Sequence, residues 1–386
     1  MKKVLFIIVL SQFLCTSLWF AGNAILPELI QKLGVSNNFL AHSTSAIQLG
    51  FILGTLFYAL FSIADRYSPS LVFFISALLA GFFNLGVNLP ELTPTLLLMV
   101  RFLTGFFLAG IYPIGIKIAA DYYQQGLGKS LGYLVGALVL GTAFPHFIKS
   151  FTLNLPWQYV TYATSLFSVI GGLLLFVLVP DGPYRTAGKS FRMMAVFDAF
   201  KNKELTSAAV GYFGHMWELY AFWTFVPLMI QNYYRHHQPL ETNSSLLSFY
   251  VIAIGSLACV FSGYLSKVVG TKKLSKIILF LSGFCCLISP LFLQVNSEAW
   301  FLAFLFFWSF VVIADSPLFS TLIAQKAPQN MKGSVITMVN CIGFFITIVS
   351  IQLISYFMDD SNELYLFTIL AIGPVIGLYF LKTKDN

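Results

Sequence analysis

Five ionisable side chains lie inside long apolar stretches of the sequence: Arg101, His146, His215, Glu218 and Asp315. Placing a charge within hydrocarbon costs about 2.5–3.5 kcal/mol on insertion scales, so each of these residues suggests a function or a fixed partner. His215 and Glu218 are three residues apart, which puts them on one face of a helix. A carboxyl beside an imidazole can exchange protons as its surroundings change. We therefore predict that this pair couples protons; the alternative is a permanent hydrogen bond between helices.

The other three ionisable residues have different sequence contexts. Asp315 comes two residues before Pro317, so it either pairs with a cation and titrates, or caps a helix that the proline interrupts. Arg101 shares a helical stripe with Tyr112, and it can hold an anionic substrate or orient a carboxylate. His146 is placed near one end of its apolar run and is predicted to contact the substrate.

Uncharged polar and aromatic residues form two further stripes at helical spacing. The first stripe consists of Gln12, Thr16, Trp19 and Asn23, and the second of Thr337, Asn340, Phe344 and Thr347. Such groups can orient a small organic solute at little desolvation cost, and Phe222, on the face of Glu218, belongs with them. Contacts between helices are the alternative, because membrane helices use the same polar residues to bind one another.

The composition excludes a soluble chain. The 386 residues are 58% hydrophobic and only 10% charged, whereas soluble domains carry about 25% charged residues. The net charge of +7 has no soluble surface on which to form a basic patch, so no nucleic-acid partner is predicted. The five cysteines lie inside apolar runs without zinc or disulfide spacing, and no metal site or cofactor is predicted. The sequence indicates a polytopic membrane protein.

Apolar windows of about 20 residues predict twelve membrane-spanning helices and no barrel strands. The windows are Val4–Ile30, Leu40–Phe61, Leu71–Asn88, Thr95–Ala119, Ser130–Ile148, Tyr159–Val179, Thr206–Ile230, Leu246–Leu265, Ser275–Gln294, Ala299–Ile323, Ser334–Phe357 and Leu364–Leu381. The apolar run behind Met1 is too long for a signal peptide, so it is predicted to stay as the first span.

The basic residues predict the orientation in the membrane. Of the 22 Lys and Arg residues, Lys32, Lys149 and Arg235 fall on one side, and Arg101 falls within a span. The remaining eighteen fall on the other side, which the positive-inside rule identifies as cytoplasmic. Both termini are therefore predicted to be cytoplasmic. A polar, basic stretch at 181–205 separates two predicted six-helix bundles, 1–180 and 206–386.

The two predicted bundles resemble each other in sequence. Ala109–Pro113 in the fourth span aligns with Ile313–Pro317 in the tenth, and both segments end in a proline. The first and seventh spans each carry a proline near the outer end, at Pro27 and Pro227. Six spans followed by six related spans is the repeat of major facilitator transporters.

Two motifs strengthen that resemblance. The stretch Gly263-x-Leu265-x-x-x-x-Gly270-x-Lys272-Lys273 is similar to the loop motif of the major facilitator superfamily, and Arg101-x-x-x-Gly105 resembles the family's fourth-span motif. In the first half the loop keeps Asp65 and Arg66. The resemblance implies two bundles that rock about a central site, a monomer, and a gating role for Asp65 and Arg66. It also implies that spans four, five, seven and ten, which carry the buried charges, line the central cavity.

Three segments resemble a bacterial branch of the family that is often labelled nitrate/nitrite-transporter-like. They are Arg101–Lys117, Trp217–Tyr220 and Ala314–Pro317. The branch implies a bacterial inner membrane. Nitrate is not predicted as the substrate, because nitrate porters carry a basic residue in the second span, and this second span has neither Lys nor Arg.

The sequence thus predicts a secondary active transporter of a small organic solute, driven by protons. Arg101 favours an anionic solute. The alternative is a proton-driven exporter of drugs or of larger natural products such as siderophores. An intramembrane enzyme or a receptor that does not transport is a further class, but an enzyme would need a nucleophile with a base, or a metal cluster, at one depth. No phosphate-binding loop of the ATP-driven kind is present in the sequence.

Overall fold

The computed structural model describes residues 2–36, 38–123, 127–152, 155–185, 198–237, 243–328, 331–358 and 363–382, and every regular element in these ranges is a helix. Contacts divide the chain into two compact units, which we call unit 1 (Met1–Phe191) and unit 2 (Arg192–Asn386). Much of the predicted central stretch, 181–205, lies outside the described residues, and the predicted bundle boundaries stay a prediction.

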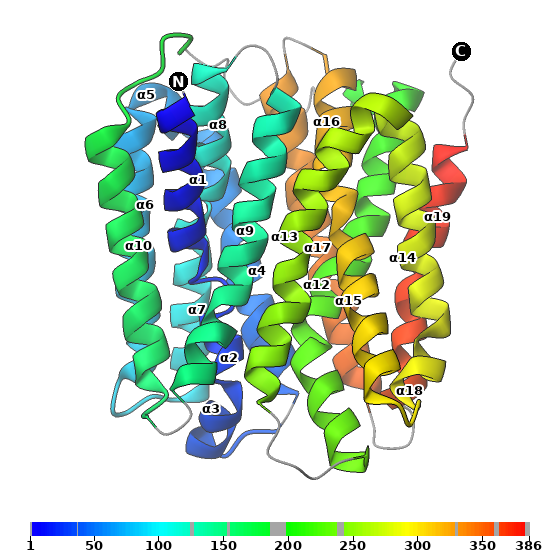
Figure 1. Ribbon diagram of the computed structural model, residues 1–386. Helices are drawn as coiled ribbons and strands as arrows, with labels where there is room; N and C mark the ends of the chain where they lie inside the picture. The colour runs from blue at the N-terminus through cyan, green and yellow to red at the C-terminus, as the bar shows by residue number, and fades with distance from the viewer. Residues whose placement is uncertain are drawn as a thin grey trace. The chain divides into compact units, whose positions relative to one another are not determined.

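Figure 1 labels the α-helices of unit 1, and one short 3₁₀ helix, η1, lies among them in the chain. Its elements are α1 (Lys2–Thr16), α2 (Ala21–Ala24), α3 (Leu26–Leu33), α4 (Phe39–Leu60), α5 (Ile63–Arg66), α6 (Pro69–Leu85), η1 (Gly86–Asn88), α7 (Pro94–Leu108), α8 (Tyr112–Tyr122), α9 (Leu127–Phe151) and α10 (Gln158–Leu178).

Unit 2 begins its long helices with α12, the extended green helix of Figure 1. Its elements are α12 (Lys203–His237), α13 (Ser244–Val269), α14 (Thr271–Leu293), α15 (Glu298–Ala314), α16 (Ser316–Lys326), α17 (Lys332–Phe357), α18 (Glu363–Leu366), η2 (Phe367–Ala371) and α19 (Ile372–Leu381). α12 packs against α16, α17 and α19, so its buried side chains face several neighbours of the same unit.

Within the described ranges, nine segments are long and apolar enough to cross a membrane, and they coincide with nine of the twelve predicted windows. The remaining windows correspond to the broken helices α1–α3, to α12, and to the short helices α18, η2 and α19. The prediction of an all-helical membrane protein is confirmed. The count of twelve spans and the side on which the termini lie stay predictions.

The first predicted span is not one continuous helix, so that part of the prediction is wrong. Residues 17–20 form turns, and the chain continues as α2 and then α3. Pro27 occupies the first turn of α3, where its missing N–H costs nothing and its fixed φ favours a new helix start. The fourth and tenth predicted spans also bend, at 109–111 and at Asp315, and Pro113 and Pro317 stand in the first turns of α8 and α16.

Small residues bring helices of each unit into close contact. In unit 1, a Cβ added to Gly50 of α4 would lie 1.9 Å from the carbonyl oxygen of Phe102 in α7. In unit 2, a Cβ on Gly214 of α12 would lie 2.3 Å from the carbonyl oxygen of Gly373 in α19. Membrane helices associate through such contacts because lipid supplies no hydrophobic drive between apolar helices. The rigid helix pairs then fix the positions of the polar side chains between them.

Candidate functional site

Glu218 lies at the centre of a buried polar cluster in unit 2. Its side chain is 0% exposed, and one carboxylate oxygen, Oε1, accepts a hydrogen bond of 2.7 Å from Nε1 of Trp308 in α15. Ser282 and Cys286 of α14 face the same carboxyl group. The second oxygen, Oε2, has no hydrogen-bond partner among the described residues. Glu218 is therefore a carboxyl group held by neutral donors.

His215 and Asp315 form the second polar pair of unit 2. His215 Nδ1 lies 2.7 Å from Asp315 Oδ1, and both side chains are buried. Asp315 stands at the break between α15 and α16, directly before Ser316 and Pro317. The imidazole lies beside the ring of Phe319, with ring centroids 6.3 Å apart. Nε2 of His215 and Oδ2 of Asp315 have no partner among the described residues.

The structure thus pairs His215 with Asp315, and not with Glu218 as the sequence predicted. His215 and Glu218 are about 4.5 Å apart along α12, and Trp308 and Asp315 are about 10 Å apart along α15. His215 and Glu218 therefore contact residues at different heights along the neighbouring helix. Helical spacing correctly placed His215 and Glu218 on one face, but the facing helix decided the partners.

Arg101 is the fully buried charged residue of unit 1, as Glu218 and Asp315 are the fully buried acidic residues of unit 2 among the described residues. The fully buried guanidinium donates from Nη1 to the carbonyl oxygen of Leu18 at 3.3 Å and from Nη2 to that of Trp19 at 2.6 Å. Both carbonyls belong to the turns between α1 and α2, where the interrupted helix leaves backbone groups to satisfy. A cation is also favoured at the carboxyl end of a helix. Arg101 therefore binds the break in the first span, and its Nε has no partner among the described residues.

Gly22 makes room for the guanidinium of Arg101. A Cβ at position 22 would lie 2.9 Å from Arg101 Nε and 3.0 Å from its Cζ. The absence of a side chain at Gly22 thus permits the approach of α7 to the break. Sequence analysis missed this role of Gly22, and the signal for it was a glycine directly before the predicted stripe residue Asn23 in an apolar run.

The polar stripe of the first span is divided by the same break. Thr16 donates to the carbonyl oxygen of Gln12, and both side chains sit against glycines of α8 and α9: Gly115 beside Gln12 and Gly141 beside Thr16. Both side-chain atoms of the Gln12 amide lack a hydrogen-bond partner among the described residues. Gln12 and Thr16 thus lie at helix contacts inside unit 1.

The second part of that stripe contacts α4. Asn23 Nδ2 donates to Thr44 Oγ1 at 2.8 Å, and the Trp19 ring lies 4.8 Å from the ring of Phe51. The turns at 17–20 place Trp19 and Asn23 outside α1, so the four predicted residues do not share one helix. The interruption of the helix is the physical reason for the difference.

The other predicted contact residues are spread over both units. Tyr112 is half-buried at the start of α8, and His146 is buried in α9 with no partner for Nε2 among the described residues. Phe222 packs on Trp308, with ring centroids 4.6 Å apart. The last two are in α17, where Asn340 is half-buried and Phe344 lies 5.2 Å from the ring of Tyr220. These positions do not test the roles predicted for them.

A charge network joins the loop after α4 to α8 and to the segment after α10. Lys117 Nζ lies 2.9 Å from Asp65 Oδ1, and Arg185 donates to the carbonyl oxygen of Tyr67 at 2.8 Å. Arg185 also forms an ion pair with Asp181. Arg66 is exposed and makes no ion pair with any residue that the structure describes. Of the predicted gating residues, Asp65 is therefore the one in the network, and its partner Lys117 was not predicted.

Trp308 is the main site residue that sequence analysis did not assign. It lies seven residues before Asp315, which is two helical turns, so the two share a face of the tenth predicted span. A tryptophan on the same face as a buried acid was the available signal. Its indole N–H needs an acceptor when buried, and an acid in a neighbouring span can supply one.

The comparisons with known proteins agree with this architecture. The model of the Major Facilitator Superfamily matches residues 8–351. The crystal structure of the human organic anion transporter MFSD10 (TETRAN) is similar in fold, with a TM-score of 0.76 and 14% identity, and the match covers 99% of each chain. No curated protein sequence matches the chain. The family match spans most of the chain, so the chain belongs to the Major Facilitator Superfamily and is a membrane transporter, not an enzyme.

Proposed function

We propose that this transporter moves a small organic solute by alternating access and that protons drive the movement through the acidic groups of unit 2. The observation that carries the proposal is the environment of Glu218. The carboxyl is fully buried, its hydrogen-bond donor Trp308 is neutral, and no ion pair among the described residues involves it. A buried charge without a cation is expensive in a low dielectric, so a proton on Glu218 is the natural counter-charge.

The pair of His215 and Asp315 supplies a second protonatable site in the same unit. The contact at 2.7 Å lets the pair carry a proton on either ring or carboxyl. Asp315 lies at the break between α15 and α16. A change in the charge of its carboxyl would therefore act on the point where one helix ends and the next begins. Alternating access would expose these groups to water on one side and then on the other, which is the requirement for coupling.

The solute is proposed as a small organic molecule without a required negative charge. The expectation of an anion rested on Arg101, and both terminal nitrogens of that side chain are bound to backbone carbonyls. The human structural neighbour is an organic anion transporter, but a neighbour at 14% identity supports the fold alone. No feature of the described residues favours the alternative of a drug exporter.

The proposed location is a bacterial cytoplasmic membrane, with a monomeric chain and both termini inside. Its support is the distribution of Lys and Arg, eighteen residues on one side against Lys32, Lys149 and Arg235 on the other. Three of the eighteen, Lys189, Arg192 and Lys384, lie outside the described residues. Labelling of single introduced cysteines on each side of intact cells would test the orientation.

The test of proton coupling begins with solutes that stabilise the purified protein in a thermal-shift screen of metabolites. Each such solute is then added to proteoliposomes that contain a trapped pH indicator. We expect solute-driven proton movement with the unmodified protein and none with Glu218→Gln, which keeps the shape and a hydrogen-bond acceptor for Trp308 but cannot release a proton.

Solute exchange between labelled and unlabelled pools is the matched control for that variant. Exchange needs no net proton movement, so Glu218→Gln should retain it if the carboxyl serves coupling alone. Proton movement at the unmodified rate in Glu218→Gln would contradict the proposal for Glu218. The same experiment with Asp315→Asn would then show whether the second site carries the coupling.

A further inference from the structure

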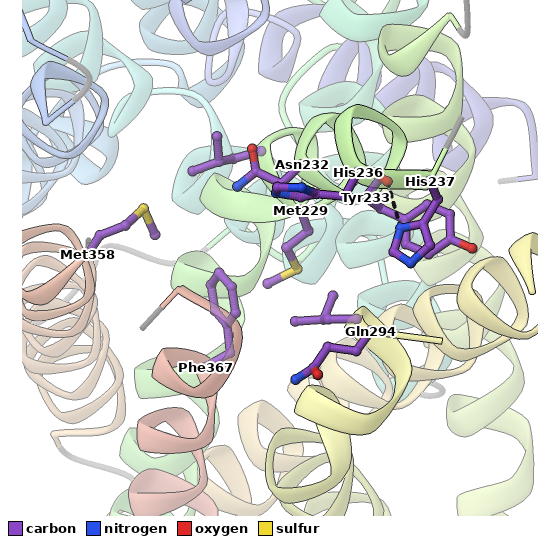
Figure 2. A pocket seen from close by; sticks show the side chains of 10 residues that line it. Met229, Asn232, Tyr233, His236, His237, Gln294, Met358 and Phe367 are labelled. Atoms are coloured by element: carbon purple, nitrogen blue, oxygen red, sulfur yellow. Dashed lines mark hydrogen bonds between the residues drawn. The ribbon is translucent and has the colours of Figure 1, made fainter. Parts of the chain in front are cut away.

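A cavity of about 310 Å³ lies in unit 2, at the end of α12 away from Lys203 (Figure 2). Its walls come from the last three turns of α12, the end of α14, the residue after α17, and η2. Pockets that hold small molecules start at about this size. Met229, in the wall of the cavity, is eleven residues beyond Glu218 in α12, which is about 16 Å along a helix. The cavity is therefore separate from the acidic cluster.

The apolar part of the cavity is suited to a flat ring. Met229, Met358 and Phe367 contribute thioether and aromatic surface, and Figure 2 shows the Met229 side chain in the middle of the lining residues, between Phe367 and Gln294. Methionine sulfur makes favourable contacts with aromatic rings and adapts to their shape. Leu293 adds further apolar wall.

The polar part is held in place by stacked rings. His237 stacks on Tyr233 with centroids 4.4 Å apart, and Tyr233 stacks on Phe301 at 3.8 Å. His237 Nδ1 lies 3.0 Å from the carbonyl oxygen of Tyr233, so this nitrogen carries the proton of the neutral ring. The other nitrogen, Nε2, is then an acceptor, and Figure 2 shows it on the side of Gln294.

The charge of the lining narrows the class of ligand. None of the ten described residues that line the cavity is Asp, Glu, Lys or Arg. A charged ligand would lose its hydration without a counter-charge in the wall, whereas an uncharged one would not. The acceptor nitrogen of His237 calls for a hydrogen-bond donor on the ligand, and the amide oxygen of Gln294 can accept from the same kind of group.

We infer that this cavity is a binding site for an uncharged aromatic molecule that carries a hydroxyl or amine donor. The ring lies against the Met229, Met358 and Phe367 surface, and the donor binds His237 Nε2. This site is additional to the proposed coupling site and does not depend on it.

The test measures equilibrium binding of 1-naphthol to the purified protein in lipid nanodiscs, with empty nanodiscs as the baseline. We expect saturable binding to one site. Met229→Trp, which fills the cavity, should weaken it at least tenfold. Met358→Trp fills the cavity from another element and should act in the same way, so the test survives if one variant fails to fold. Both variants are first checked for monodispersity and thermal unfolding.

The donor requirement is tested with 1-methoxynaphthalene, which keeps the ring and oxygen but has no O–H. It should bind about fivefold more weakly than 1-naphthol, the effect of one hydrogen bond. His237→Phe keeps an aromatic ring on Tyr233 but removes the acceptor, so it should weaken 1-naphthol binding to a similar extent. His42→Phe, the same change at an exposed position of α4, is the control and should leave binding unchanged.

Two outcomes would overturn the inference. Equal binding to the unmodified protein and to both tryptophan variants would mean that the probe dissolves in lipid and not in the cavity. Equal binding of the two naphthalene probes, with no effect of His237→Phe, would show an apolar crevice without the proposed donor recognition.

Discussion

The two units differ in the ionisable side chains that they bury completely: an arginine in unit 1 and two acidic residues in unit 2. In unit 1 the fully buried charge among the described residues is Arg101, a permanent cation that donates to backbone carbonyls of a broken helix. In unit 2 the buried charges are carboxyls, whose partners are the side chains of Trp308 and His215. A guanidinium that binds backbone stabilises one conformation, and a carboxyl with side-chain partners can change its protonation state. Under the proposed coupling mechanism, unit 1 would therefore be the fixed part and unit 2 the part that responds to protonation.

The largest expected effect comes from removing the cation of unit 1. Arg101→Met would leave the carbonyls of Leu18 and Trp19 buried without donors, so we expect a loss of about 3–5 kcal/mol of stability. Thermal unfolding followed by tryptophan fluorescence measures this loss. Glu218→Gln is the matched variant of unit 2 and should change stability far less. If Arg101→Met unfolds at the normal temperature but does not transport, Arg101 serves the solute or the proton, and the contrast between the units is wrong.

A smaller loss is expected from crowding the same side chain. Gly22→Ala would place a Cβ 2.9 Å from Arg101 Nε, so either the guanidinium or α2 must shift. Overpacking of this kind costs about 1–3 kcal/mol. Gly333→Ala is the control, because a Cβ there has no heavy atom within 4 Å and the residue lies in a helix. Equal unfolding temperatures for the two alanine variants would argue against a fixed guanidinium.

The pairing within unit 2 is tested by a double-mutant cycle on His215→Ala and Asp315→Ala. Residues in direct contact show coupling energies of about 0.5–3 kcal/mol, and residues that share no partner show nearly additive effects. We expect clear coupling for His215 with Asp315 and little for His215 with Glu218. The free energy of unfolding of each single and double variant is the quantity compared. Stronger coupling to Glu218 would restore the partner that helical spacing predicted.

The smallest effect is expected at the charge network of unit 1. Lys117 and Asp65 are each about one-quarter exposed, so water and salt screen their ion pair. Lys117→Met should cost about 0.2–1 kcal/mol, and the cost should shrink in high salt. Unfolding temperatures at low and high salt measure it. Arg66→Met, an exposed residue without an ion pair among the described residues, is the control. A large loss of stability in Lys117→Met would show that the charge network contributes strongly to the stability of unit 1.

Much of the fold followed from patterns along the chain. Apolar runs predicted the helices, and the prolines at 27, 113 and 317 stand where helices start again. The prediction of one unbroken first span failed because a hydropathy window measures apolar content and not helix continuity. Turns at 17–20 stay hidden in such a window, since their residues are as apolar as their neighbours.

The residue types, and the faces of the acids of unit 2 and of the arginine of unit 1, were determined by the sequence alone. They follow from counting along a helix, because a helix repeats every 3.6 residues. The faces of the first polar stripe do not, because the turns at 17–20 divide it. The tertiary structure decided which helix each face meets. In the folded protein His215 contacts Asp315, Glu218 accepts a hydrogen bond from Trp308, and Arg101 donates to two backbone carbonyls. Partners across helices depend on packing and on where a helix breaks, and neither is encoded in the spacing within one helix.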